Sequence, residues 1–426
     1  MLIKSLSLKD FKCFEQVDID FGKITLLTGA NSSGKSSLIY ALLGIMQSKY
    51  FPQYFALNGE LINMGGFDEV LRKKAKKREF EINAHIDSAF VDDKYFTTWI
   101  EDESTQQPTL NFLNQTDCTL YINEESKIIV DGYLFDDYAF EQLLKLNPEV
   151  VCLDKTDDKE SPYIANKYHV RGTISESSEV IASYFDNHGR HDVNLLYLFS
   201  DERFNFNYIG SFRLPPERTY YRKPNASKVG VNGEGYIDQI IKWEESDKKK
   251  YDELIEAVTE IGLFKTIQAN KMKGGRFELN VQVNENSELA SLTDVGFGIS
   301  QFLPIIVADL QMGDDSCLAI SQPEIHLHPK IQATLGDYFC KQVNNTDKQY
   351  IVETHSEYLI NRMRLLIVKG ELKPEDVKLY YMENDGIKTT TYAIELTTDG
   401  QIKNAPQGFF DTYEMDVMDI ALYASE

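Results

Sequence analysis

Residues 29–36 read GANSSGKS and match the pattern G-x-x-x-x-G-K-[ST] at every fixed position. A loop of this kind binds phosphate by directing backbone N–H groups at phosphate oxygens beside the N-terminus of a helix. It therefore needs a strand before it and a helix after it. Residues 24–28 form a short β-branched and leucine-rich run, and residues 37–47 place leucines and a methionine at helical spacing. The sequence thus predicts a strand–loop–helix unit that binds a nucleoside triphosphate.

The residues of this loop have separate expected roles. Gly29 and Gly34 permit the turn of the backbone, Lys35 reaches the β and γ phosphates, and the hydroxyl of Ser36 ligates Mg²⁺. The other positions predicted to contact the nucleotide are Asn31, Ser32, Ser33 and Ser37.

The net charge of the chain limits which macromolecules it is expected to bind. The formal net charge is −23, from 67 acidic and 44 basic residues, which argues against a protein whose whole surface wraps nucleic acid. The basic run RKKAKKR at residues 72–78 remains a possible local nucleic-acid strip, although a solvated helix face is the more frequent meaning of such a run.

Cysteine usage and hydropathy indicate the compartment. The five cysteines are far apart, include no C-x-x-C pair and are odd in number, which favours a reducing cytoplasm. The N-terminus alternates polar and apolar residues, and no apolar run reaches the length of about 18 residues that a membrane-spanning helix needs. We therefore expect a cytoplasmic location, no export signal and no membrane partner.

Hydropathy patterns divide the chain into four expected segments. Residues 1–90 alternate as strands around the phosphate loop, and residues 91–205 change to short aromatic, Asp-rich and Asn-rich stretches typical of an inserted mixed α+β lobe. Residues 206–275 form a helical lobe, with helical periodicity from 234 to a stop at Gly262, and residues 276–426 alternate strands and helices again. No heptad pattern persists for three or four repeats, so the predicted fold class is α/β without a long coiled coil.

Three later segments decide among the many nucleotide-binding families. The first is a Gly-rich turn that enters an apolar helix, and the second and third are apolar strands that end in polar residues. Their sequences are LTDVGFGISQFLP at residues 292–304, CLAISQPEIHLHP at 317–329 and YIVETHSEYL at 350–359.

In this order the segments resemble the signature, Walker B and switch-histidine motifs of ABC-type ATPases, in the branch that includes the Rad50, RecF and OLD-family heads. Within that branch the chain is most similar to bacterial AAA-like proteins that end in a DUF3696 domain. The resemblance covers nearly the whole chain except residues 91–205. It rests also on LKDFKCF, INMGGFDEV, RLPPERTYY with VGVNGEG, and the ending DGQIKNAPQGFFD. It implies an ATP-binding head with a mixed sheet and flanking helices.

The resemblance also implies a mechanism. ABC-type heads close as a head-to-tail homodimer, in which each ATP lies between the phosphate loop of one subunit and the signature turn of the other. Gly296 and Gly298 would let that turn approach the γ-phosphate, and Ser300 or a backbone N–H would donate to it. His355 would contact the γ-phosphate from its strand end, and Lys12 matches a basic residue that some heads place near the α-phosphate.

The Walker B segment departs from the family pattern. ABC-type ATPases end this strand in an aspartate that organises Mg²⁺ and a glutamate that activates water, whereas this chain has Ser321 and Gln322. A serine hydroxyl can hold a water of the Mg²⁺ shell, but a glutamine cannot accept a proton, so turnover by that route should be slow or blocked.

Three interpretations of Gln322 stay open. Related sequences commonly end this strand in E-Q-P-E, so Gln322 could be natural and Glu324 the catalytic base. The protein could instead bind ATP and hydrolyse it slowly, as a nucleotide-gated clamp. In the third interpretation, a native glutamate at this position was exchanged for glutamine to trap ATP.

Two functional classes follow from the resemblance. In the first, an ATPase dimer or higher homo-oligomer controls a separate effector protein, usually a nuclease, in bacterial anti-phage defence. In the second, the chain is itself a nuclease with a C-terminal Toprim domain. Only about 70 residues follow His355, fewer than a Toprim fold needs, so we expect the first class. A RecF-like or Rad50-like repair ATPase that binds DNA directly is the alternative, and residues 91–205 are where we expect partner specificity.

Overall fold

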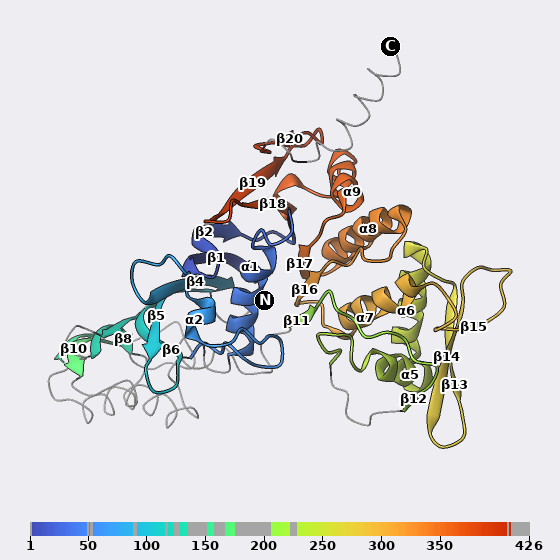
Figure 1. Ribbon diagram of the computed structural model, residues 1–426, viewed down its shortest axis with the longest axis horizontal. Helices are drawn as coiled ribbons and strands as arrows, with labels where there is room; N and C mark the ends of the chain where they lie inside the picture. Colours follow the sequence, from blue (N-terminus) through green and yellow to red (C-terminus); the bar gives the residue numbers. More distant parts are fainter. Residues whose placement is uncertain are drawn as a thin grey trace, which may run out of the picture. The chain divides into compact units, whose positions relative to one another are not determined.

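The structure, a computed structural model shown in Figure 1, divides into two units along the chain. The first comprises Met1–Asp20 and Ser37–Phe204, and the second comprises Phe21–Ser36 and Asn205–Glu426. The described residues are 2–48, 51, 54–87, 92–115, 118–122, 128–134, 151–156, 167–174, 206–221, 228–406 and 409. Much of the expected insert at 91–205 therefore lies outside the described residues, and so does part of the C-terminal DGQIKNAPQGFFD motif.

The first unit is built on an antiparallel sheet with the strand order β2-β1-β4-β5-β6-β7-β8-β10-β9. Its strands are β1 (Leu2–Phe11), β2 (Phe14–Asp20), β4 (Glu79–Asp87), β5 (Asp92–Asp102), β6 (Gln107–Gln115), β7 (Cys118–Ile122), β8 (Ile128–Leu134), β9 (Val151–Thr156) and β10 (Lys167–Ile174). Helix α1 (Lys35–Gln47) enters this unit from the phosphate loop, and the short α2 (Phe67–Val70) follows. The boundary expected near residue 90 falls between β4 and β5, which are hydrogen-bonded neighbours in this sheet.

Alternating hydropathy explains why the sheet of the first unit has one buried face. In β4 every second residue is buried, including Phe80, Ile82 and Ile86, because successive side chains of a strand point to opposite faces. Phe80 packs edge-on against the rings of Phe11 and Phe55, at centroid distances of 5.6 and 6.1 Å. Aromatic packing of this kind supplies much of the core of the unit.

The basic run at residues 72–78 is not a helix, so the expectation of a solvated helix face was wrong. These residues form turns between α2 and β4. Arg72 is held by Asp10, with Nε and Oδ1 2.6 Å apart, and Arg78 contacts both Asp68 and Glu101. Acids outside the run thus pair with both arginines, which leaves less free positive charge on the run for contact with DNA.

The second unit contains a seven-stranded sheet with the order β11-β16-β17-β3-β18-β19-β20. The strands from β11 to β18 in this order are parallel, and β19 and β20 are antiparallel additions. Their bounds are β3 (Ile24–Gly29), β11 (Phe206–Ile209), β16 (Cys317–Ser321), β17 (Gln349–Glu353), β18 (Val377–Asn384), β19 (Thr389–Leu396) and β20 (Ile402–Lys403). A smaller sheet is formed by β12 (Tyr220–Tyr221), β13 (Thr266–Lys271), β14 (Arg276–Gln282) and β15 (Ala290–Ser291).

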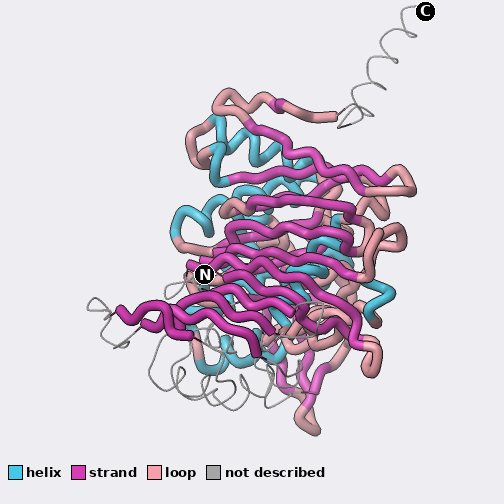
Figure 2. The backbone as a smooth tube through the Cα atoms, turned by 90° about the vertical axis from the view of Figure 1, so that its left-hand side faces the viewer, coloured by secondary structure: helices cyan, strands magenta, loops and turns pink. Residues whose placement is uncertain are grey.

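Helices cover this parallel sheet, and α8 and α9 lie side by side next to β17 and β18 in Figure 1. The helices are α5 (Tyr236–Ser246), α6 (Lys248–Ile261), α7 (Phe297–Gln311), α8 (Pro329–Asn345), α9 (Glu357–Val368) and the 3₁₀ turn η2 (Pro374–Asp376). Every residue of β3, β16 and β17 is buried, as expected for parallel strands in the interior of such a layered fold. Figure 2 shows the strands of each sheet as adjacent magenta tubes.

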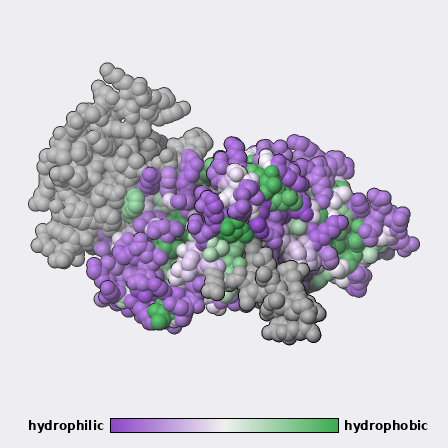
Figure 3. Space-filling model, turned by 90° about the horizontal axis from the view of Figure 1, so that it is seen from above, coloured by the Kyte–Doolittle hydropathy of each residue, from purple (hydrophilic) through white to green (hydrophobic). Residues whose placement is uncertain are grey.

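The structure confirms the predicted α/β class. The strand, phosphate loop and helix occur in the predicted order, and the periodicity between 234 and 262 corresponds to α5 and α6, ended by Gly262 at a φ of 86°. No long coiled coil occurs in the part of the chain that is described. Among the same residues, no helix has the length and apolar character required to cross a membrane. On the face shown in Figure 3, hydrophilic side chains predominate and hydrophobic ones gather in small separate patches.

Candidate functional site

The phosphate loop has the backbone conformation that its motif requires. It follows β3, the strand between β17 and β18, and ends where α1 begins at Lys35. Gly29 has a φ of 135° and Gly34 a φ of 107°, values at which a side chain would be strained. A Cβ atom on Gly29 would also lie 2.1 Å from the carbonyl oxygen of Met382. Both glycines are therefore required by the turn itself.

Lys35 is folded back into its own loop. Its Nζ donates to the carbonyls of Gly29 at 3.0 Å and Ala30 at 2.7 Å, and only 3% of the residue is exposed. Burial lowers the pKa of Lys35, against the opposing effect of the Glu353 and Glu324 carboxylates. A phosphate oxygen would offer this ammonium a full negative charge, which the loop carbonyls do not.

A carboxylate that the sequence analysis did not single out lies at the centre of the site. Glu353 ends β17 and is 5% exposed. Ser36 Oγ donates to its two oxygens at 2.9 and 3.1 Å, and Ser321 Oγ donates to Oε2 at 3.0 Å. Tyr208 is hydrogen-bonded to the same Ser321 hydroxyl at 3.1 Å. The start of α1 and the end of β16 thus converge on the acidic group that ends β17.

Glu353 was missed because its importance depends on strand order. In the sequence it is one acid at the end of an apolar run, two residues before His355, to which the phosphate contact was assigned. The sequence did contain a signal for it. Glu353 ends one apolar strand with an acid, whereas the other apolar strand ends at Ser321, where the family pattern has an acid. Only the order β16-β17-β3 shows that these ends are neighbours.

Glu324 is a carboxyl group with one satisfied and one unsatisfied oxygen. Its Oε1 accepts from the backbone N–H of His355 at 2.6 Å, whereas Oε2 is buried without a hydrogen-bond partner among the described residues. Burial raises the pKa of Glu324, although hydrogen bonds and the charge of Arg213 oppose the effect. A carboxylate with a raised pKa and a free lone pair is suited to accept a proton.

His355 follows β17 directly and carries its imidazole at the protein surface. Desolvation lowers its pKa, and the positive charge of Lys35 lowers it further. A lowered pKa favours the neutral imidazole, which has one donor and one acceptor nitrogen. Its contact with a γ-phosphate remains a prediction.

Arg213 ties the loop after β16 to helix α7. Its Nη2 donates to the carbonyls of Ser321 at 2.7 Å and Gln322 at 2.8 Å, and its Nη1 donates to that of Gln301 at 3.1 Å. Burial lowers the pKa of Arg213 to about 10. Gln322 has a φ of 50° and donates its N–H to the carbonyl of Glu353 at 2.7 Å. Hydrogen bonds with Arg213 and with Glu353 thus fix the backbone just before Glu324.

The signature turn lies at the N-terminus of α7. Gly296 is the exposed N-cap, and Phe297 beside it is 45% exposed. Ser300 is buried, and its hydroxyl donates to the carbonyl of Phe297 at 2.8 Å. This arrangement favours backbone N–H groups over the Ser300 hydroxyl as donors to a ligand. Gly298 packs closely on the turn after β16, because a Cβ there would lie 2.5 Å from the carbonyl oxygen of His326.

We expect Gly298→Ala to lower the free energy of unfolding by about 1–3 kcal/mol, the usual cost of overpacking a well-packed site. The neighbour is backbone, which cannot move aside as a flexible side chain does. Gly296→Ala is the matched control, since a Cβ added at that position would have no neighbour within 4 Å among the described residues, and it should unfold as the parent does. Urea unfolding followed by circular dichroism measures both; equal stability of the two variants would contradict the close packing.

Lys12 and the phosphate loop belong to different units of the structure. Lys12 belongs to the first unit, where its Nζ lies 5.9 Å from the centre of the Tyr40 ring and burial lowers its pKa. Its role near an α-phosphate stays a prediction. The loop positions Asn31 and Ser32 are exposed, and Ser33 is buried.

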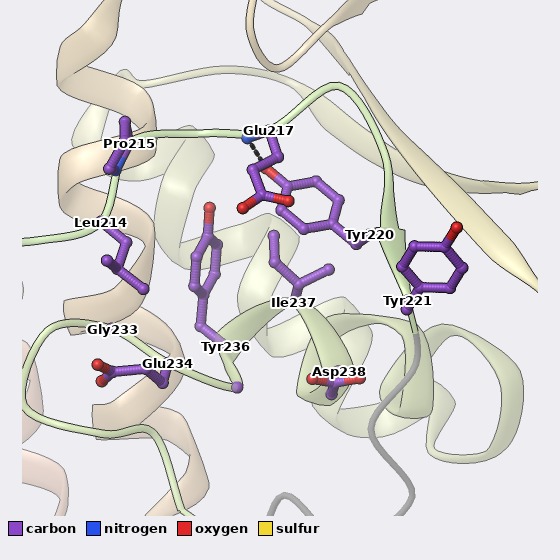
Figure 4. Close-up of a pocket in the computed structure, with 11 residues that line it drawn as sticks. Leu214, Pro215, Glu217, Tyr220, Tyr221, Gly233, Glu234, Tyr236, Ile237 and Asp238 are labelled. Atoms are coloured by element: carbon purple, nitrogen blue, oxygen red, sulfur yellow. Dashed lines mark hydrogen bonds between the residues drawn. The ribbon is translucent and has the colours of Figure 1, made fainter.

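A pocket of about 240 Å³ lies elsewhere in the second unit (Figure 4). It is lined by part of the segment RLPPERTYY and by residues 233–238. The side chains of Glu217, Tyr220 and Tyr236 point towards one another in the close-up. The backbone N–H of Glu217 donates to the hydroxyl of Tyr220 at 2.8 Å. Its lining thus combines tyrosine rings and carboxylates with the N-terminal residues of α5.

The donor atoms around Glu353 are of the kind that Mg²⁺ prefers. They are two serine hydroxyls and one carboxylate, and Mg²⁺ is typically bound through one or two carboxylates together with substrate phosphates. The described residues include no group of three or more His, Cys, Asp or Glu that would enclose a metal by itself. The donor set thus fits an ion shared with a nucleotide.

Comparison with known proteins places the chain in a family. A family model described as AAA ATPase domain matches residues 1–360, and one described as a protein of unknown function (DUF3696) matches residues 372–420. A comparison with curated proteins finds no match.

Solved structures of SMC heads are similar to the chain at low sequence identity. The SMC head domain from Thermotoga maritima is 12% identical over 93% of this chain and 100% of that chain, with a TM-score of 0.36. An SmcHead bound to the C-winged helix domain of ScpA is 12% identical over 93% of this chain and 99% of that one, with a TM-score of 0.46. An Smc head domain with an extended coiled coil bound to the C-terminal domain of ScpA, derived from Pyrococcus furiosus, is 11% identical over 100% of this chain and 99% of that one, with a TM-score of 0.41.

The AAA match spans most of the chain, and the phosphate loop that it implies has the geometry described above. The nucleotide-binding assignment and the C-terminal resemblance are thereby confirmed at the level of the family. The protein belongs to the AAA ATPase domain family and carries a DUF3696 region at residues 372–420.

Proposed function

We propose that this chain is a Mg²⁺-dependent ATP hydrolase in which Glu324 is the catalytic base. The observation that carries the proposal is the buried, unpartnered Oε2 of Glu324, on a carboxyl group whose other oxygen is fixed by the N–H of His355. The γ-phosphate would take the place of the carbonyls that now hold Lys35. Mg²⁺ would supply charge neutralisation of the phosphates. Glu324 would accept the proton of the attacking water, and His355 would position that water or the phosphate.

Among the three interpretations of Gln322, the geometry supports a natural glutamine with the base two residues later. The backbone of Gln322 is used structurally, since its N–H donates to Glu353 and its carbonyl accepts from Arg213. Its amide side chain cannot accept a proton, whereas Glu324 has a free oxygen. The base therefore does not need a glutamate at position 322.

We further propose that ATP closes two copies of the chain head to tail. The exposed N-terminus of α7 supports this, because the first N–H groups of a helix and its dipole favour an anion such as the γ-phosphate of a partner copy. Gly296 leaves that helix end open, since apart from adjacent chain no described residue lies within 4 Å of the point that its Cβ would occupy. The signature turn would then complete a site that one copy lacks.

A dimerisation experiment tests this arrangement. Light scattering with Mg²⁺ and ATP should show the parent and Gly296→Ala as dimers, while Gly296→Glu remains a monomer. The glutamate is compatible with a helix N-terminus but repels phosphate there. If Gly296→Glu dimerises as the parent does, the signature turn does not bind nucleotide across the interface.

The ATPase is proposed to control a partner effector, a nuclease of a bacterial anti-phage defence system. This rests on the family resemblance and on the net charge of −23, which favours a protein partner over extended DNA contacts. Co-purification of the chain with the nuclease of a neighbouring gene, in the presence of ATP, tests it. Salt-sensitive binding of duplex DNA without such a partner would favour the alternative, a repair ATPase that binds DNA directly.

A further inference from the structure

The end of β16 lacks an acid, and the neighbouring strand β17 provides one in register with it. Ser321, where the ABC-type pattern has its metal-organising aspartate, is the parallel-ladder partner of Glu353. The carboxylate therefore lies on the neighbouring strand, β17, instead of on β16. It stays at the same edge of the sheet, beside β3 and the phosphate loop.

Hydrogen bonds connect this carboxylate with the residue that the loop motif assigns to the metal. Ser36 donates its only hydroxyl proton to Glu353, at 2.9 Å from Oε1, and Ser321 donates its own at 3.0 Å from Oε2. A serine hydroxyl has one proton and two acceptor lone pairs. Because both protons are directed to Glu353, Ser321 Oγ must accept its hydrogen bond from Tyr208 and keeps one lone pair for a cation or its water ligands. Ser36 Oγ keeps lone pairs for the same purpose.

The charge balance around Glu353 favours a cation. The residue is 5% exposed, and the two hydroxyl groups that donate to its carboxylate, those of Ser36 and Ser321, are neutral. The ammonium of Lys35 interacts electrostatically with Glu353 but donates its hydrogen bonds to loop carbonyls. Burying an ionised carboxylate is costly unless a cation is near it, so a divalent ion beside Glu353 would lower this cost.

We propose that Glu353 is the acidic group of the Mg²⁺ site and replaces the aspartate that β16 lacks. It accepts hydrogen bonds from the hydroxyls of Ser36 and Ser321, orients their oxygens and would offset part of the charge of the ion. This deepens the proposed function and depends on it, because the ion is bound together with ATP at the phosphate loop.

The test measures metal binding directly, without turnover. Mn²⁺ binding to the protein–ATP complex is followed by electron paramagnetic resonance, and ATP binding is measured separately in EDTA by calorimetry. For Glu353→Gln we expect Mn²⁺ affinity to fall by about 10–100-fold, as for residues that support metal ligands, while ATP affinity in EDTA is kept. Glu395→Gln removes the same charge from an exposed position on β19 and should leave both affinities unchanged.

A charge-swap variant separates a metal role from a folding role. Ser321→Asp combined with Glu353→Gln returns the carboxylate to β16 and should recover Mn²⁺ affinity over Glu353→Gln alone. This double variant keeps one acid at the site, so it can be used even if Glu353→Gln fails to fold. Mn²⁺ binding by the folded double variant supports the proposal. Loss of Mn²⁺ binding in the folded double variant overturns it. Parental Mn²⁺ affinity in folded Glu353→Gln also overturns it. Absence of ATP binding by the parent in EDTA and in Mg²⁺ would instead refute the proposed function.

Discussion

Replacing Lys35 with alanine is expected to reduce kcat for ATP hydrolysis by roughly 10²–10³-fold, the usual effect of removing one preorganised group that stabilises transition-state charge. Lys35 is buried in the phosphate loop with its Nζ held by the carbonyls of Gly29 and Ala30, which places a positive charge where the motif puts the β and γ phosphates. ATP affinity should fall as well. Phosphate release and calorimetry measure the two effects.

Lys23→Ala is the matched control for this variant. Lys23 precedes the same strand, is exposed and lies 3.6 Å from Asp376. Its loss should leave turnover and ATP affinity unchanged. If Lys35→Ala binds ATP with the affinity of the parent, the nucleotide binds elsewhere, and the assignment of residues 29–36 as the phosphate loop is wrong.

The second large effect is expected for Glu324→Gln, which should lower kcat by about 10²–10⁴-fold, the range of general acid–base catalysis. ATP binding and ATP-dependent dimerisation should persist, because the amide keeps the shape of the side chain and an oxygen for the N–H of His355. A stable ATP-bound dimer in light scattering, together with single-turnover kinetics, would show this pattern.

The pH profile gives an independent check on the base. Burial raises the pKa of Glu324, and a base acts only when it is ionised. In the parent, kcat/KM should therefore decline as pH falls through this raised pKa, above the value of about 4.3 usual for glutamate. Glu324→Gln should lose this acidic limb.

Gln322→Glu distinguishes the remaining interpretations. If Gln322 is natural and Glu324 is the base, the parent turns over ATP and the added glutamate gives little gain. An inactive parent that binds ATP and becomes active with Gln322→Glu would show that position 322 carries the base. Glu324 would then be a structural acid next to His355.

The sequence predicted local elements well where one stretch of chain contains the whole signal. The order of β3, loop and α1 followed from a motif, and the stop of α6 at Gly262 followed from helical periodicity ended by a glycine. The basic run at 72–78 was misassigned as a helix face because its charges are held by acids distant in sequence, such as Asp10 and Glu101. Charge patterning alone does not reveal such partners.

The sequence by itself determined the phosphate loop, since its function depends on consecutive backbone N–H groups, two glycines and one lysine within residues 29–36. It also determined the α/β class, through apolar runs and periodicities that are local. Only the tertiary structure decided that Glu353 meets Ser36 and Ser321, and that Glu324 keeps one buried oxygen without a partner among the described residues. The physical reason is that hydrogen bonding between strands sets their order, and this order brings together side chains that are far apart in the chain.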